Sequence, residues 1–194
     1  MRARHKKKDK RKVVHEGRFL KFITCGEWEY VKRNNCTAIV IIAALTANRE
    51  ILFVEQYRPP MGKLAVEFPA GLVNDRGLKT RESRARAAKR ELLEETGYRA
   101  GTLLKILEGP VSSGCSADRV TMFMATDVQK ETEGGGDEFE SIKVHKIPLD
   151  AADAWLEKMR KKGRLIEPKI YAGLYFLKSY NKQTYRRTTL KRSR

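Results

Sequence analysis

The stretch Glu82–Tyr98 reads ESRARAAKRELLEETGY, and it is the part of the chain that decides the fold. Ser83 is a good N-cap residue, and Gly97 stands where a glycine commonly ends a helix, so the stretch predicts a helix that closes at Thr96. Its apolar stripe recurs at i, i+3 and i+7 and consists of Ala85, Ala88 and Leu92.

The same helix places several carboxylates together. Glu91 and Glu95 are four residues apart and therefore share a face, with Glu94 beside them. Acids at a helix C-terminus oppose the helix dipole and repel one another, and a hard cation such as Mg²⁺ resolves that repulsion with its oxygen ligands. Arg90, four residues before Glu94, can hold that carboxylate in place. The pattern indicates a divalent-cation site.

Outward from this helix the chain alternates between strand and helix patterns, as an α/β protein does. Gly71–Arg81 reads as a polar loop before the helix. Strands are predicted at Cys36–Leu45, Ile51–Tyr57, Leu64–Phe68, Thr102–Leu107, Val120–Val128 and Ser141–Ile147, with a small sheet within residues 13–35. Two further helices are predicted at Ala151–Lys162 and Lys169–Tyr180.

These residues resemble the signature of the Nudix hydrolase family. Glu82 is followed by seven residues and then by RELLEETGY, Arg90–Tyr98, which completes the helical half of that signature. The loop half departs from it, because ten residues rather than five separate Gly71 from Glu82, and Arg81 replaces a glycine. The departure leaves the role of Glu82 open and gives the loop an apparent five-residue insertion.

Flanking motifs narrow the resemblance to the ADP-ribose and nucleoside diphosphate sugar pyrophosphatases. They are VEQYRPP at Val54–Pro60, EFPAG at Glu67–Gly71 and WEYVKR at Trp28–Arg33. The resemblance implies a Nudix fold: an α/β/α sandwich around a mixed β-sheet, with a small N-terminal β segment and the acidic helix on one edge. It also implies a hydrolase that splits nucleotide sugars, ADP-ribose first and GDP-mannose or others next, into a nucleoside monophosphate and a sugar phosphate.

Site residues follow from the same resemblance. The metal set is the Ala70 carbonyl with Glu91, Glu95 and Glu94, which would hold two or three Mg²⁺ ions, Mn²⁺ being an alternative. The substrate set is Arg58 as a bidentate fork on the diphosphate, Trp28 stacking on the base, Glu67 pairing an arginine or the substrate, and Arg33 and Ser113. Arg90 joins the candidate catalytic set.

A general base is expected on the segment GGGDEFE, residues 134–140. Glu138 and Glu140 resemble the paired glutamates on the mobile loop of ADP-ribose pyrophosphatases, one of which takes a proton from the attacking water. Glu140 is favoured because it lies nearer the next strand, and Glu138 is the alternative. The three glycines suggest a loop that swings over substrate.

The formal charge of +17 is concentrated at the two ends. Residues 1–12 hold eight Lys or Arg and one Asp, and residues 178–194 hold seven Lys or Arg and no acid. We therefore divide the chain into a basic tail at 1–12, a segment at 13–35 for dimerisation and base stacking, a Nudix domain at 36–180 and a basic tail at 181–194. The tails suit weak, non-specific contact with nucleic acid.

Other features restrict the class of protein. No apolar run approaches the length that spans a bilayer, so we expect a cytoplasmic protein without membrane contact, a homodimer by the resemblance. Three cysteines, Cys25, Cys36 and Cys115, predict reduced thiols, and the three histidines form no metal motif. Two rival functions remain: a Nudix hydrolase of RNA 5′ ends or dinucleoside polyphosphates, and a non-catalytic RNA-binding module.

Overall fold

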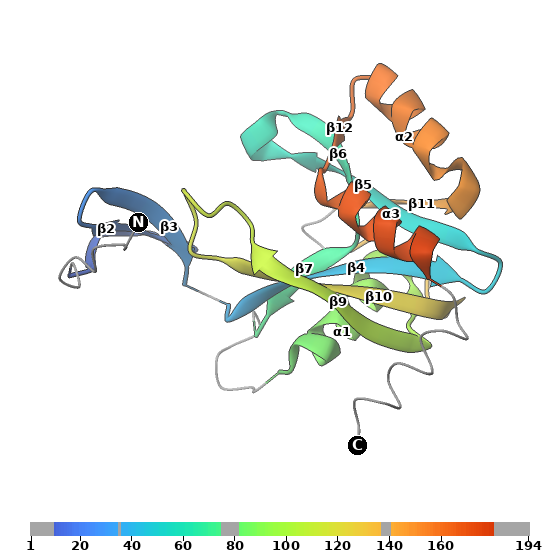
Figure 1. Cartoon of the computed structure of the whole chain (residues 1–194), viewed down its shortest axis with the longest axis horizontal. Coiled ribbons are helices and arrows are strands. Elements are labelled where there is room, and N and C mark those ends of the chain that lie inside the picture. The colour runs from blue at the N-terminus through green and yellow to red at the C-terminus, as the bar shows by residue number, and fades with distance from the viewer. Residues whose placement is uncertain (1–9, 35, 75–81, 137–140, 181–194) are drawn as a thin grey trace, which may run out of the picture.

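The computed structural model describes residues 10–34, 36–74, 82–136 and 141–180. Two sheets organise it (Figure 1). The smaller is an antiparallel three-stranded sheet near the N-terminus, made of β1 (Lys12–Glu16), β2 (Leu20–Cys25) and β3 (Trp28–Arg33). This confirms a small N-terminal β segment. Within the described residues no helix has the length and hydropathy that a bilayer crossing requires.

The larger sheet has nine strands and is mixed, as predicted. Its path runs β12 (Leu165–Ile166), β6 (Lys63–Glu67), β5 (Glu50–Arg58), β4 (Ala38–Thr46), β10 (Arg119–Lys130) and β8 (Tyr98–Arg99). Three strands lie off that path: β7 (Ala70–Val73) on β4, β9 (Thr102–Pro110) on β10 and β11 (Lys143–Pro148) on β5. The pairs β4–β10 and β6–β12 are parallel, and the other pairs are antiparallel.

Strand β4 explains why helices cover both faces. Successive side chains of a strand point to opposite faces, and nearly all of this apolar run is buried. Ile41, Ala43 and Leu45 enter the core beneath α2 (Ala152–Lys161) and α3 (Lys169–Ser179). Val40, Ile42 and Ala44 enter the core beneath α1 (Arg84–Thr96). The result is the predicted α/β/α sandwich, with 3₁₀ turns at η1 (Pro59–Met61) and η2 (Leu149–Ala151).

Three local predictions are wrong. The segment expected to be a loop from Gly71 begins as strand β7, because its apolar residues pair with β4 and Val73 is buried. Helix α1 packs across β7 and β4 and so covers a face of the sheet instead of an edge. Its buried residues begin in the second turn with Ala87 and Ala88, so Ala85 is exposed.

Candidate functional site

Helix α1 is capped at both ends by the residues that the sequence predicted. The Ser83 hydroxyl accepts a hydrogen bond from the Arg86 amide at 3.2 Å. Gly97 closes the helix at φ +75, and its amide donates to the Leu93 carbonyl at 2.8 Å. These caps fix the rotation of the helix, and with it the directions of its acidic side chains.

Two of the acidic side chains are buried. Glu91 is 8% exposed and Glu95 is 3% exposed, whereas the side chain of Glu94 is 35% exposed. An ionised carboxylate in such a place needs hydrogen bonds or a positive partner, because burial removes its hydration. Two buried carboxylates one turn apart therefore mark a place built around positive charge.

Arg90 supplies part of that charge. Its guanidinium contacts one oxygen of Glu91 at 2.8 Å and donates to Glu94 at 3.0 Å. It also donates to Glu82 at 3.0 and 3.2 Å, and to the Leu72 carbonyl at 3.0 Å. One arginine thus joins three carboxylates to strand β7. We call Arg90, Glu82, Glu91, Glu94 and Glu95 the acidic network.

The place of Glu82 in this network is what sequence reasoning left open. Its amide donates to the Asn74 side-chain oxygen at 2.7 Å, and its carboxylate accepts from the Asn74 amide at 3.2 Å. Asn74 sits at φ +64, and its side-chain amide donates to the Thr37 hydroxyl at 3.1 Å. These hydrogen bonds therefore hold together the two residues that flank positions 75–81. Despite the apparent insertion before it, Glu82 therefore lies within hydrogen-bonding distance of Arg90.

The main chain of β7 lies directly against the carboxylates. The Ala70 amide donates to Glu95 at 3.2 Å. A Cβ atom added at Gly71 would lie 2.0 Å from the carboxyl carbon of Glu91. Since real Cβ contacts are never so short, only glycine leaves room for this carboxylate at position 71.

Arg58 and Glu67 form an ion pair across β5 and β6. The Arg58 guanidinium contacts one Glu67 oxygen at 2.8 Å through Nε and 2.6 Å through Nη2. Both line a cavity of about 200 Å³, together with Ala70, Arg33 and Phe68. The structure thus brings four predicted site residues, Arg33, Arg58, Glu67 and Ala70, around one hollow beside the acidic network.

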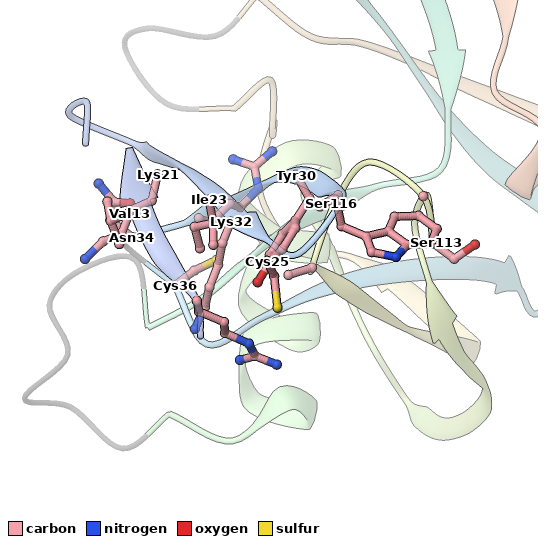
Figure 2. A pocket seen from close by; sticks show the side chains of 15 residues that line it. Val13, Lys21, Ile23, Cys25, Tyr30, Lys32, Asn34, Cys36, Ser113 and Ser116 are labelled. Carbon is pink, nitrogen blue, oxygen red and sulfur yellow. The ribbon is translucent and has the colours of Figure 1, made fainter. Parts of the chain in front are cut away.

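A second cavity, of about 830 Å³, lies against the small sheet and gathers Trp28, Arg33 and Ser113. Figure 2 shows side chains of β2 and β3, among them Ile23 and Tyr30, and Ser116 of the β9–β10 connection around this hollow. Hydrogen bonds from the Val31 amide to Cys115 and from the Ala117 amide to Val31 hold that connection against β3. Trp28 lines this cavity and is 63% exposed, so its side chain is accessible to a ligand.

Arg33 lines both cavities. Its guanidinium Nε lies 3.5 Å from Asp118, and its amide donates to the same carboxylate at 3.4 Å. The sequence marked Arg33 as a substrate residue but gave no sign that it stands between the two hollows. That position depends on how the small sheet meets β10, which no local pattern encodes.

The glycines before the expected base are held against helix α1. The amides of Gly135 and Gly136 donate to the backbone carbonyls of Glu95 and Glu94, at 2.8 and 3.1 Å. Gly134, Gly135 and Gly136 all have positive φ, and a Cβ on Gly134 would meet Thr96 at 2.3 Å. Glycine is therefore needed here for conformation and close packing, not only for mobility. Glu138 and Glu140 lie outside the described residues.

The donor set suits a divalent cation. Buried carboxylates beside a strand backbone offer the hard oxygen atoms that Mg²⁺ and Mn²⁺ prefer. Among the described residues, no three carboxylate, imidazole or thiol groups converge as a complete set of side-chain ligands. A cation at this place would therefore complete its coordination with main-chain oxygen, water or substrate. The three cysteines, all within the described ranges, form no disulfide.

Comparisons with known proteins place the chain in a family. The NUDIX domain model matches residues 35–170. The chain is 30% identical to an ADP-sugar pyrophosphatase of Mus musculus, over 89% of this chain and 88% of that protein. It is 33% identical to a methanol dehydrogenase activator of Bacillus methanolicus, over 62% of this chain and 63% of that protein, which is less than two thirds of its length. The crystal structure of an ADP compounds hydrolase superposes with a TM-score of 0.65 at 18% identity, covering 88% of this chain and 90% of that one, a likeness of fold alone.

Proposed function

Because this chain belongs to the NUDIX family, we propose that it hydrolyses the pyrophosphate bond of a nucleoside diphosphate sugar, with ADP-ribose as the first candidate. The observation that carries the proposal is the buried acidic network beside a cavity that also holds Arg58 and Arg33. The match to an ADP-sugar pyrophosphatase over nearly the full length of both chains supports the same substrate class.

Glu91, Glu95 and the Ala70 carbonyl would hold a divalent cation, Mg²⁺ first and Mn²⁺ as the alternative, with Glu94 as a further ligand. When bound, such a cation absorbs negative charge that develops on the phosphoryl oxygens. Arg90 acts as a positioning residue, because it binds three carboxylates at once and so orients the ones that face the cation.

Arg58 and Arg33 bind the diphosphate. Each keeps one carboxylate partner, Glu67 and Asp118, so each guanidinium is oriented before substrate arrives. Trp28 stacks on the base, and Ser113 lies in the same large cavity. The large cavity would therefore accommodate the nucleoside on one side of Arg33, and the cavity that contains Arg58 would accommodate the diphosphate on the other.

Glu140 takes the proton of the attacking water, and Glu138 is the alternative base. Support comes from Gly135 and Gly136, whose hydrogen bonds tie the chain just before these residues to the acidic end of α1. Water then attacks one phosphorus, the bridging oxygen leaves with the other phosphoryl group, and a nucleoside monophosphate and a sugar phosphate result.

The acting unit is proposed to be a homodimer. The small sheet exposes Val13, Val14, Leu20 and Trp28, and its β1–β2 connection exposes Phe19. Such apolar exposure on one small sheet is typical of an interaction surface. Sedimentation equilibrium of the full chain distinguishes the dimer from the monomer, and the monomer would contradict this part of the proposal.

The test is a panel of ADP-ribose, GDP-mannose, dinucleoside polyphosphates and triphosphate-ended RNA, each incubated with Mg²⁺. The variants are Glu91→Gln, Glu138→Gln and Glu140→Gln, with Glu55→Gln as a matched control, because Glu55 is equally buried but lies outside the acidic network. We expect release of nucleoside monophosphate from a nucleotide sugar, lost in Glu91→Gln and in one of the two loop variants. Turnover confined to RNA or dinucleoside polyphosphates, or no turnover at all, would contradict the proposal.

A further inference from the structure

A third cavity, of about 200 Å³, lies where helix α1 begins, and its polar lining is mainly basic. We call it the basic pocket. Its charged and hydroxyl side chains are Lys32, Arg33, Thr37, Arg84, Asp118 and Arg119. They come from the end of β3, the approach to β4, the first residue of α1 and the first residue of β10.

The acids near the basic pocket do not balance its cations. Asp118 faces Arg33, and Glu108 is shared among Arg84 at 3.4 Å, Arg119 at 4.0 Å and Lys105. A hydrogen bond from Lys105 lowers the pKa of Glu108, and desolvation opposes that effect. Over the described part of the chain Lys32 makes no ion pair. Four cations therefore line the pocket, and among the described residues they pair only with Asp118, which lines it, and with Glu108, which Lys105 shares.

Helix α1 adds to the excess of positive charge. The N-terminus of a helix carries a partial positive charge, and cations there are unfavourable. Arg84 and Arg86 nevertheless occupy the first turn, which contains no acid, and the N-cap Ser83 is neutral. In addition, the buried Nε of Arg33 makes no hydrogen bond within the described residues. A bound anion would offset the excess of positive charge at this helix end.

The basic pocket borders the cavities of the proposed substrate site. It shares Lys32, Arg33, Cys36 and Ala117 with the cavity that contains Trp28, and Arg33 and Ile39 with the cavity that contains Arg58. An anion in the basic pocket therefore lies within reach of a nucleotide bound in its neighbours, yet apart from Arg58 and the acidic network.

We infer that the basic pocket binds an additional phosphate monoester on the nucleoside part of the substrate, beyond the diphosphate that is cleaved. The substrate class becomes a ribose-phosphorylated nucleoside diphosphate sugar. This inference rests on the proposed function for the identity of the nucleotide. Guanidinium groups suit the role, since they form charge-assisted hydrogen bonds with phosphate oxygens.

A binding measurement without metal or turnover tests the pocket itself. Calorimetry compares 5′-AMP with adenosine 2′,5′-bisphosphate and 3′,5′-bisphosphate on the full chain, on Arg84→Gln and on Arg119→Gln. Arg160→Gln, an exposed arginine paired with Glu157 on α2, is the matched control. We expect one bisphosphate to bind about tenfold more tightly than 5′-AMP, as one or two charge-assisted contacts allow. That preference should fall below about threefold in Arg84→Gln and persist in Arg160→Gln.

Equal binding of 5′-AMP and both bisphosphates, or a preference that survives both pocket substitutions, would overturn the inference. A short RNA that binds through Arg84 while the bisphosphates gain nothing would also overturn it, because the pocket would then take a phosphodiester backbone. Circular dichroism of each variant shows whether it is folded.

Turnover separates this inference from the proposed function. We expect kcat/KM for 2′- or 3′-phosphorylated ADP-ribose to exceed that for ADP-ribose, and Arg84→Gln to remove the difference while leaving ADP-ribose cleavage within about twofold. Cleavage of ADP-ribose without any preference refutes the inference and leaves the proposed function intact. Absence of all cleavage refutes the proposed function. In that case the calorimetric preference for a bisphosphate over 5′-AMP still tests whether the basic pocket binds a phosphate.

Discussion

Two networks of buried charge occupy different parts of this molecule, and their balance differs. In the acidic network, one arginine serves Glu82, Glu91 and Glu94 while Glu95 lies beside them. In the second network, beneath α2, one carboxylate has two partners: Glu55 accepts from Arg164 at 2.8 Å and lies 2.7 Å from the His145 ring. We call Glu55, His145 and Arg164 the balanced network.

The difference teaches how to distinguish a structural network from a ligand site. The balanced network is satisfied by its own residues, and the ring of Trp155 packs against His145 with centroids 4.9 Å apart. Within the described residues, the acidic network sets four carboxylates against the guanidinium of Arg90. Crowded buried carboxylates are costly unless a cation or ligand compensates them, so the balanced network should govern folding stability and the acidic network should govern activity.

The largest expected effect is on turnover. Glu91→Gln should lower kcat/KM for the nucleotide sugar by more than about a hundredfold, because even partners of metal ligands give tenfold to hundredfold losses. Glu55→Gln should lower it by less than about threefold. Steady-state kinetics of both variants under the same conditions measure this difference. Equal losses of kcat/KM in the two variants would contradict the distinction between the two networks.

A subtler change places a methyl group against the same carboxylate. Gly71→Ala should displace the Glu91 carboxylate and lower kcat/KM by between about tenfold and a hundredfold, since a shift of an ångström is enough for that. Gly109→Ala is the matched control, because its Cβ would meet nothing within 4 Å. If Gly71→Ala kept full activity, the tight approach of β7 to the acidic network would have no functional meaning.

The balanced network should make the stability of the fold depend on pH in the acid range. Burial raises the pKa of Glu55, but hydrogen bonds and charges from Arg164 and His145 outweigh that effect, so the folded pKa lies below the ordinary value of a glutamate. The stabilisation is therefore present near pH 7 and is lost as the pH falls through the folded pKa. Glu55→Gln should destabilise the protein by about 2 kcal/mol at pH 7 and by less at pH 3.5, as measured by urea unfolding.

Glu157→Gln provides the control for that experiment, because its carboxylate pairs with Arg160 at the surface. Exposed pairs contribute little, so this substitution should leave the unfolding curve nearly unchanged. A constant difference between wild type and Glu55→Gln at both pH values would contradict the assignment of the effect to ionised Glu55.

The smallest effect concerns stability in the presence of cation. At ten times its dissociation constant, Mg²⁺ should stabilise the folded protein by about 1.4 kcal/mol and raise Tm by roughly 3 °C. Glu91→Gln should lose this shift and Glu55→Gln should keep it, in scanning calorimetry with and without EDTA. A shift of equal size in both variants would mean that the cation binds elsewhere.

Much of this could be predicted from sequence because the decisive features are local. Ser83 and Gly97 act through the backbone next to them, and the spacing of Glu91 and Glu95 fixes a shared helix face. The nearly continuous apolar run of β4 likewise predicts a strand that is buried on both faces. These predictions needed only neighbours within a turn of helix or along a strand.

Other features depend on contacts between distant segments. The pairing of Glu82 with Arg90 and Asn74 bridges the inserted loop, and β7 is a strand only because β4 lies beside it. The basic pocket brings together residues as far apart in sequence as Lys32, Arg84 and Arg119. His145, which reads as an isolated histidine, gains its partner Glu55 only when β11 pairs with β5.

The central claim is that the carboxylates of the acidic network form a divalent-cation site. Electron paramagnetic resonance of Mn²⁺ tests it most directly, by titrating the ion into wild type, Glu55→Gln and the double variant Glu91→Gln/Glu95→Gln. We predict equal binding to the first two proteins and at least about tenfold weaker binding to the double variant. Mn²⁺ binding that is unchanged in the double variant would contradict the claim.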